Sequence, residues 1–191
     1  MIRLIVPYKK IIPDEYVQTI NDIDYNKLYS MGKRIILTDL DNTLISYAQE
    51  RPTPEVFEWK KMVEEIGFEV IIVSNNRKDR VKLFADELGV PYYSKAMKPF
   101  KKGFKRGIKL ASRKYDANEV LEIGDQLLTD VFGSKRMGYY TVLVKAIDHK
   151  TEKWTTRFNR KNEIKMLKKC KKKNPSLYRA KLEAYEKENL W

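Results

Sequence analysis

Short runs of β-branched and other apolar residues alternate along the chain with longer stretches of helical periodicity. Five apolar runs are typical of buried strands: RIILT (34–38), EVIIVS (69–74), VLEIG (120–124), YYTVLV (139–144) and the weaker PYY (91–93). Between them, apolar side chains share one helical face over 54–66, 77–88, 100–114 and 127–137. Strands that alternate with helices of this length predict an α/β fold. Its mainly parallel five-stranded sheet is covered on both faces, in three αβα layers.

Charge is distributed unevenly along the 191 residues, whose net charge is +13. Residues 145–191 hold 15 Lys/Arg against six Asp/Glu, and residues 95–114 hold nine Lys/Arg and no acid. Such segments attract phosphates, nucleic acid or acidic lipid, although a solvated basic surface explains the tail equally well.

The length and the charge pattern together suggest one domain with an extension. We expect the domain over 1–150, with residues 1–32 as a family-specific segment, and a basic helical extension over 151–191. Within that extension, KKCKKK is expected to be a solvated linker, and Asn174–Pro175 to open a last helix. Asn76 is expected to cap the helix over 77–88, and Asp24 to cap a short helix over 25–31.

Cysteine usage and hydropathy restrict the cellular setting. The single Cys170 excludes an internal disulfide framework, no apolar run approaches a membrane span, and the first residues are too short for a signal peptide. We therefore expect a cytoplasmic protein, with peripheral contact at the inner face of the membrane as an option.

An acidic cluster, Asp39-Leu40-Asp41-Asn42-Thr43, follows the first of these strands. Two acids two residues apart at the end of an apolar strand are costly without a cation or hydrogen-bond donors. Mg²⁺ meets this need, because it takes oxygen ligands and leaves positions for water and phosphate. Taken alone, the cluster is equally compatible with an Asx-type turn.

Three further polar clusters come after later strands. Ser74-Asn75-Asn76 can donate hydrogen bonds to phosphoryl oxygens, or simply cap a helix. Lys98 can neutralise phosphate and a nucleophile together, and Asp125 is a second metal acid that Asp130 can support from the next helix. The order DxD, Ser, Lys, GDxxxxD, with strands ahead of the first, second and fourth clusters, predicts one phosphoryl-transfer site.

TDLDNTL, VSNN, KP and GDQLLTD resemble motifs I to IV of the haloacid dehalogenase (HAD) phosphatases. The segments around them, PDEYVQTINDIDYNKLYSMGKR and GDQLLTDVFGSKRMGYYTVLV, resemble the YqeG family of class IIIA HAD phosphatases. The resemblance covers about residues 10–165, including TRFNRKNE, and implies a Rossmann-like HAD core. Related fungal and plant enzymes of this group are phosphatidylglycerophosphate phosphatases of phospholipid biosynthesis.

The resemblance also implies roles for individual residues. Asp39 is the nucleophile that becomes an aspartyl-phosphate, and Asp41 protonates the leaving group and then activates water. Mg²⁺ would be held by the Asp39 carboxylate, the Asp41 backbone carbonyl and Asp125. The phosphate-binding residues would be Ser74, Asn75, Lys98 and Thr43, and Asp130 would support the metal shell or Lys98.

The gaps between motifs have room for a single helix each, so we expect no cap domain and an open site that suits a large substrate. Phosphatidylglycerophosphate is the favoured substrate. The alternatives are nucleic-acid 3′-phosphate ends, small phosphometabolites, and a non-catalytic basic module that docks on membrane or RNA. The basic helix over 100–114 fits either an anionic lipid surface or a solvated face, and for Phe100 and Phe104 we favour the core over membrane anchoring.

Overall fold

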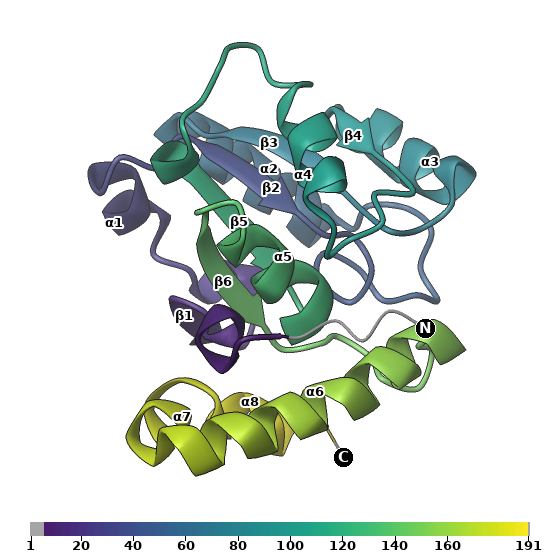
Figure 1. The fold of residues 1–191 in the computed structure, drawn as a ribbon. Helices are drawn as coiled ribbons and strands as arrows, with labels where there is room; N and C mark the ends of the chain where they lie inside the picture. The colour runs from purple at the N-terminus through teal and green to yellow at the C-terminus, as the bar shows by residue number, and fades with distance from the viewer. Residues whose placement is uncertain (1–5, 191) are drawn as a thin grey trace.

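The computed structural model describes residues 6–190, and its centre is a six-stranded parallel sheet (Figure 1). The strand order is β1-β6-β5-β2-β3-β4. The strands are β1 (Glu15–Val17), β2 (Ile35–Thr38), β3 (Glu69–Val73), β4 (Tyr92–Tyr93), β5 (Val120–Gly124) and β6 (Tyr140–Val144). The expected class and arrangement are confirmed, but the count of five is one short. The missed strand is β1, whose three half-buried residues leave no apolar run in the sequence.

Strand β2 lies in the middle of the sheet, paired with β3 on one side and β5 on the other. Its last residue, Thr38, is in register with Ile72 and with Ile123. The residues that follow these three strands therefore emerge at one edge, where ligands of parallel sheets bind.

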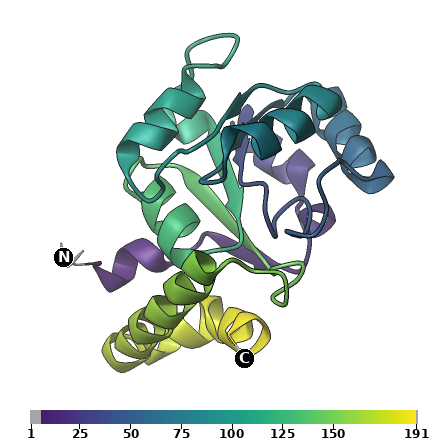
Figure 2. The same cartoon turned by 90° about the vertical axis from the view of Figure 1, so that its right-hand side faces the viewer.

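Helices cover both faces of the sheet and complete three layers (Figures 1 and 2). On one face lie α1 (Tyr25–Ser30), α2 (Pro54–Ile66) and α3 (Lys78–Leu88). On the other lie α4 (Lys101–Ile108), α5 (Phe132–Lys135) and the wide helical turn η4 (Leu127–Val131). Short 3₁₀ turns are η1 (Tyr8–Ile11), η2 (Ile20–Asp22) and η3 (Ala117–Glu119). Helix α2 has its predicted bounds, and its periodic residues Trp59 and Val63 are buried.

Three of the helices predicted between the strands differ from their expected bounds. Helix α3 starts at Lys78 with Arg77 at its N-cap, so Asn76 does not cap it. The Asn76 side chain instead hydrogen-bonds Asp41 and Lys153. Helix α4 ends at Ile108 instead of continuing to residue 114, and 127–137 folds as the turn η4 followed by the short α5.

The C-terminal extension folds against the core as α6 (Trp154–Lys173), α7 (Pro175–Lys181) and α8 (Glu183–Asn189) (Figure 1). The expectation that KKCKKK forms a solvated linker is wrong, because α6 continues through this segment with Leu167 and Cys170 buried. The expected cap is confirmed: the Asn174 side chain accepts a hydrogen bond from Leu177 N. The expectation of a single last helix is wrong, because the segment folds as two helices that meet at Leu182. Its expected apolar residues Tyr178, Leu182 and Tyr185 are nevertheless all buried in the cluster that covers β6.

The expected absence of a cap domain agrees with the described residues. A loop, α2 and β3 separate Asp41 from Ser74, and α3 and β4 separate Ser74 from Lys98. In the part of the chain from 6 to 190, no helix combines the length and the apolar character needed to cross a bilayer.

Candidate active site

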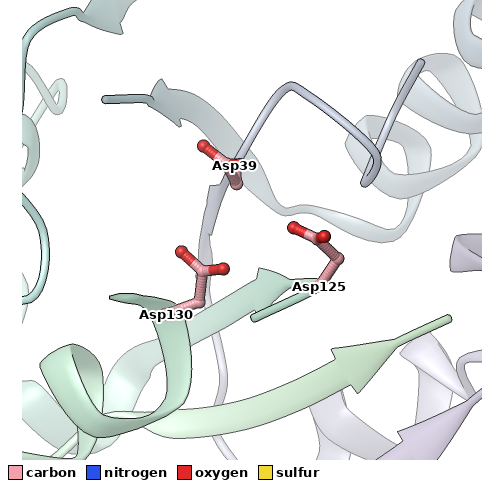
Figure 3. A group of neighbouring side chains, drawn as sticks. All are labelled: Asp39, Asp125 and Asp130. Atoms are coloured by element: carbon pink, nitrogen blue, oxygen red, sulfur yellow. The ribbon is translucent and has the colours of Figure 1, made fainter. Parts of the chain in front are cut away.

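Three buried carboxylates converge at the carboxyl edge of the sheet (Figure 3). Asp39 follows β2, Asp125 follows β5, and Asp130 comes from η4. If one carboxylate oxygen is taken from each residue, the three oxygens lie within 4.8 Å of one another. The strand register explains the meeting of Asp39 and Asp125, and the turn η4 brings Asp130 back over β5.

Lys98 lies among these acids. Its Nζ is 2.9 Å from Asp39 Oδ1 and 2.6 Å from Asp130 Oδ1. Asn75 fixes the backbone there, since Lys98 N donates to Asn75 Oδ1 at 2.6 Å and Asn75 Nδ2 donates to Lys98 O at 3.1 Å. Burial alone would lower the pKa of Lys98, but Asp130 and Asp39 raise it above its usual value. Lys98 is therefore a fixed positive charge.

The charges at this edge favour a cation. Burial, opposed in part by Lys98, raises the pKa of Asp39 to about 7, and burial raises the pKa of Asp125 well above its usual range. Asp125 Oδ1 is buried and has no hydrogen-bond partner within residues 6–190. A buried carboxylate oxygen with no donor, beside two more acids, suits a hard divalent cation such as Mg²⁺. The donor set fits the predicted metal.

Arg160 of α6 holds the other side of Asp125, which the motif analysis did not predict. Its Nη2 donates to Asp125 Oδ2 at 2.5 Å, and its Nη1 donates to Asp125 O at 3.1 Å. Arg160 also donates to Glu152 Oε1 at 2.9 Å and to the Tyr185 hydroxyl at 2.8 Å. Tyr185 in turn donates to Glu163 Oε2 at 2.7 Å. The only sequence signal was the place of Arg160 in TRFNRKNE, within the family resemblance.

Asp41 faces a different set of partners from Asp39. Asn76 Nδ2 donates to Asp41 Oδ2 at 2.6 Å, and Arg80 Nε donates to Asp41 Oδ1 at 2.7 Å. The Asp41 carboxylate is therefore apart from the acid cluster and acts as a hydrogen-bond acceptor. That its backbone carbonyl binds metal stays a prediction. Arg80 was not singled out in the sequence, because its place on α3 resembles that of any surface arginine.

A pocket of about 280 Å³ opens at this edge. Five predicted site residues line it: Asp39, Asp41, Ser74, Asn75 and Lys98. Eight other residues complete the lining: Tyr47, Asn76, Gln126, Thr129, Lys153, Thr155, Thr156 and Asn159. The first turns of α6 therefore form one wall, so the extension takes part in the site. Thr43 is the exception: it is buried and does not line this pocket, so the structure does not bring it together with the other predicted phosphate-binding residues.

Comparison with known proteins identifies the family. The model of the family described as mitochondrial PGP phosphatase matches residues 1–148. The chain belongs to this family. The phosphatase is also 42% identical over 165 residues to the protein named Probable phosphatase YqeG from Bacillus subtilis (strain 168), covering 86% of this chain and 94% of the relative. The predicted resemblance to YqeG-like HAD phosphatases and the enzyme class are confirmed.

Solved structures similar to the phosphatase include a HAD phosphatase from Thermococcus onnurineus. That match has a TM-score of 0.42 and 15% identity, and it covers 59% of this chain and 86% of that chain. A hypothetical protein from Xanthomonas campestris matches with a TM-score of 0.49 and 15% identity, covering 72% of this chain and 80% of that chain.

Proposed function

We propose that this HAD phosphatase is a Mg²⁺-dependent phosphomonoester hydrolase that works through an aspartyl-phosphate on Asp39, with phosphatidylglycerophosphate as its substrate. The observation that carries the proposal is the contact of Lys98 with both Asp39 and Asp130, beside Oδ1 of Asp125, which has no hydrogen-bond partner among the residues that the structure describes. Phosphoryl transfer needs mainly positioning and neutralisation of charge on the phosphoryl oxygens.

Asp39, Asp125 and Asp130 are the carboxylates placed to hold the cation, with the Asp41 carbonyl as a further expected ligand. When bound, Mg²⁺ supplies positive charge for the phosphoryl oxygens. Lys98 adds a second, permanent charge on the same group. Ser74, whose side chain is buried at the pocket wall, offers a hydroxyl to the phosphoryl group.

The reaction divides into two displacements. An Asp39 carboxylate oxygen forms a bond to phosphorus while the bond from phosphorus to the ester oxygen breaks, and Asp41 gives its proton to the departing alkoxide. Water then forms a bond to phosphorus while the bond to Asp39 breaks, Asp41 takes the proton of the water, and inorganic phosphate leaves. The donors Asn76 and Arg80 hold Asp41 as an acceptor, which suits the second step.

A lipid head group as substrate is supported by the location of the pocket and by its surroundings. Without a cap domain, a phosphate on a large molecule can reach Asp39 while the rest of that molecule stays outside. The basic residues of 95–114 begin at this pocket, beside Lys98, and favour an anionic surface.

The test compares hydrolysis of four substrates: phosphatidylglycerophosphate in detergent, an aryl phosphate, a 3′-phosphorylated oligonucleotide and sugar phosphates. We expect Mg²⁺-dependent release of phosphate, greatest with the lipid, lost with EDTA and lost in Asp39→Asn with the fold intact. Asp41→Asn should slow turnover by about 10²–10⁴-fold. Equal or better turnover of the oligonucleotide or sugar phosphates would reassign the substrate. A fully active Asp39→Asn would rule out the aspartyl-phosphate.

A further inference from the structure

Large apolar side chains are exposed on the two segments that flank the catalytic pocket. Met97 and Phe100 lie on either side of Lys98 and Pro99 and are 66% and 49% exposed. Trp154 and Phe158 lie on α6 and are 78% and 59% exposed. We call these four residues the apolar rim. The expectation that Phe100 belongs to the core is wrong, whereas for Phe104, which is fully buried, it is confirmed.

The residues of the apolar rim are sequence neighbours of residues that line the pocket, on two different segments of the chain. Lys98 lines the pocket from the β4–α4 loop, and Thr155 and Asn159 line it from α6. Trp154 and Phe158 are one turn apart, so they share one face of the helix. That face lies beside the stripe that lines the pocket and opposite the buried stripe. Figure 2 shows the first turns of α6 and the loop before α4 on the side of the molecule to which the strands point.

The surface around the apolar rim is cationic. Helix α6 contains one acid, Glu163, and this acid is fully buried. The outer surface of α6 therefore carries basic side chains with no exposed acid, as does the segment 95–114. Exposed cations near the rim are Lys95, Lys101, Lys102, Lys105, Lys153, Arg157 and Lys161. A second copy of this chain would bring like charges together, so the charge disfavours self-association and favours an anionic partner.

A shallow hollow of about 340 Å³ lies on the outer side of the same loop. Met97, Phe100 and Tyr93 contribute apolar surface to it, and the cations Lys95 and Lys102 line it as well. A recess lined by both apolar side chains and cations matches a lipid, whose head group is anionic and whose chains are apolar.

We propose that the apolar rim and its surrounding cations form a docking surface for an anionic lipid bilayer, which turns the mouth of the catalytic pocket toward the head groups. Exposed apolar side chains at the edge of a functional site mark interaction surfaces. Aromatic side chains flanked by Lys and Arg are suited to the region between head groups and acyl chains. This inference rests on the proposed lipid substrate, because docking serves the site by presenting that substrate to Asp39.

Trp154 itself reports the contact. Trp59 is buried, so in a Trp191→Phe background the emission from an exposed tryptophan comes from Trp154. We expect a blue shift with vesicles of phosphatidylglycerol and phosphatidylcholine, quenching by lipids brominated on the acyl chain, and neither effect with phosphatidylcholine alone. An unshifted emission with the anionic vesicles would overturn the proposal.

Two double variants separate docking from catalysis. Trp154→Ser/Phe158→Ser should reduce co-sedimentation with the anionic vesicles at least tenfold and reduce lipid-phosphate hydrolysis on vesicles in parallel. Hydrolysis of a water-soluble aryl phosphate should not change. The matched control Met31→Ser/Phe57→Ser removes two exposed apolar residues from α2 and the end of α1 and should bind vesicles as the parent does. Melting temperature confirms that each variant folds.

The outcomes distinguish this inference from the proposed function. If the parent protein does not hydrolyse the aryl phosphate, the proposed chemistry is overturned, whatever the vesicles show. If the two double variants bind vesicles equally well, the docking role of the apolar rim is overturned. A different result would be that the parent binds a single-stranded RNA but no vesicles, and that the rim variant loses the RNA binding. This result would assign the surface to nucleic acid and overturn the proposal that its partner is a bilayer.

Discussion

Arg160 binds the carboxylate of Asp125 through the oxygen that faces away from its unpartnered one. The 2.5 Å contact from Nη2 to Oδ2 leaves Oδ1 with no protein partner in residues 6–190. Arg160 comes from α6 and Asp125 from the end of β5, 35 residues apart. The C-terminal extension thus orients a residue of the acid cluster without entering that cluster.

Replacing Arg160 should lower the affinity of the protein for Mg²⁺. We expect Arg160→Lys to keep a charge beside Asp125 and lose its forked contact, with Mg²⁺ affinity about 10–100-fold lower. Titration calorimetry of Mg²⁺ on the purified protein measures this without substrate. Arg157→Lys, on the exposed side of the same helix, is the control and should bind Mg²⁺ as the parent does. Equal affinity in the two variants would contradict a positioning role for Arg160.

Removing the charge of Lys98 should destabilise the metal-free protein. Lys98→Met leaves Asp39 and Asp130 buried beside each other without their shared cation. Breaking a buried ion pair on one side costs about 3–5 kcal/mol. Urea unfolding of parent and variant in EDTA measures the difference, and the variant should also lose phosphatase activity. A free energy of unfolding within ~1 kcal/mol of the parent would contradict the fixed-charge role.

The stability of the metal-free protein should fall as the pH rises from about 4 toward 7. Burial raises the pKa of Asp39 from an ordinary 3.8 to about 7. In this window the native state retains a proton that the unfolded state releases, so higher pH favours unfolding. Mg²⁺ binds the deprotonated carboxylates, so it should raise the melting temperature more at pH 8 than at pH 5. Asp125 and Glu122, whose pKa values burial also raises, contribute in the same direction. Asp39→Asn should therefore reduce the pH dependence in EDTA without abolishing it, whereas an unchanged slope would assign it to the other acids.

Gly124 should tolerate no side chain, because of its approach to Asp130. A Cβ added to Gly124 would lie 2.5 Å from Cβ and Cγ of Asp130. Gly124→Ala must therefore displace the acid that pairs with Lys98, at a cost of about 1–3 kcal/mol for an overpacked site. The melting temperature and the Mg²⁺ affinity of the variant should both be lower than those of the parent. A variant with the melting temperature and Mg²⁺ affinity of the parent would show that Asp130 can move without consequence.

Local pattern was sufficient where one element carries its own signal. Short apolar runs predicted β2, β3, β5, β6 and the short β4, and Asn174 predicted the start of α7. It was insufficient for β1, which is too short to form an apolar run. It was also insufficient for KKCKKK, where one buried cysteine among lysines is significant only once α6 is known to pack on η1 and η4.

From the sequence alone, five of the six strands, the order of the motifs and the acids Asp39 and Asp125 could be predicted, because apolar runs and turn chemistry are local and the ends of parallel strands meet at one edge. Only the packed fold shows that Arg160 orients Asp125, that Asn76 and Arg80 hold Asp41, and that α6 forms a wall of the pocket. These partners come from elements far apart along the chain, and no spacing in the sequence encodes how a helix packs across the edge of a sheet. Burial then gives a single arginine or lysine its effect on the site, since a charge removed from water is bound to the few partners that the packing places around it.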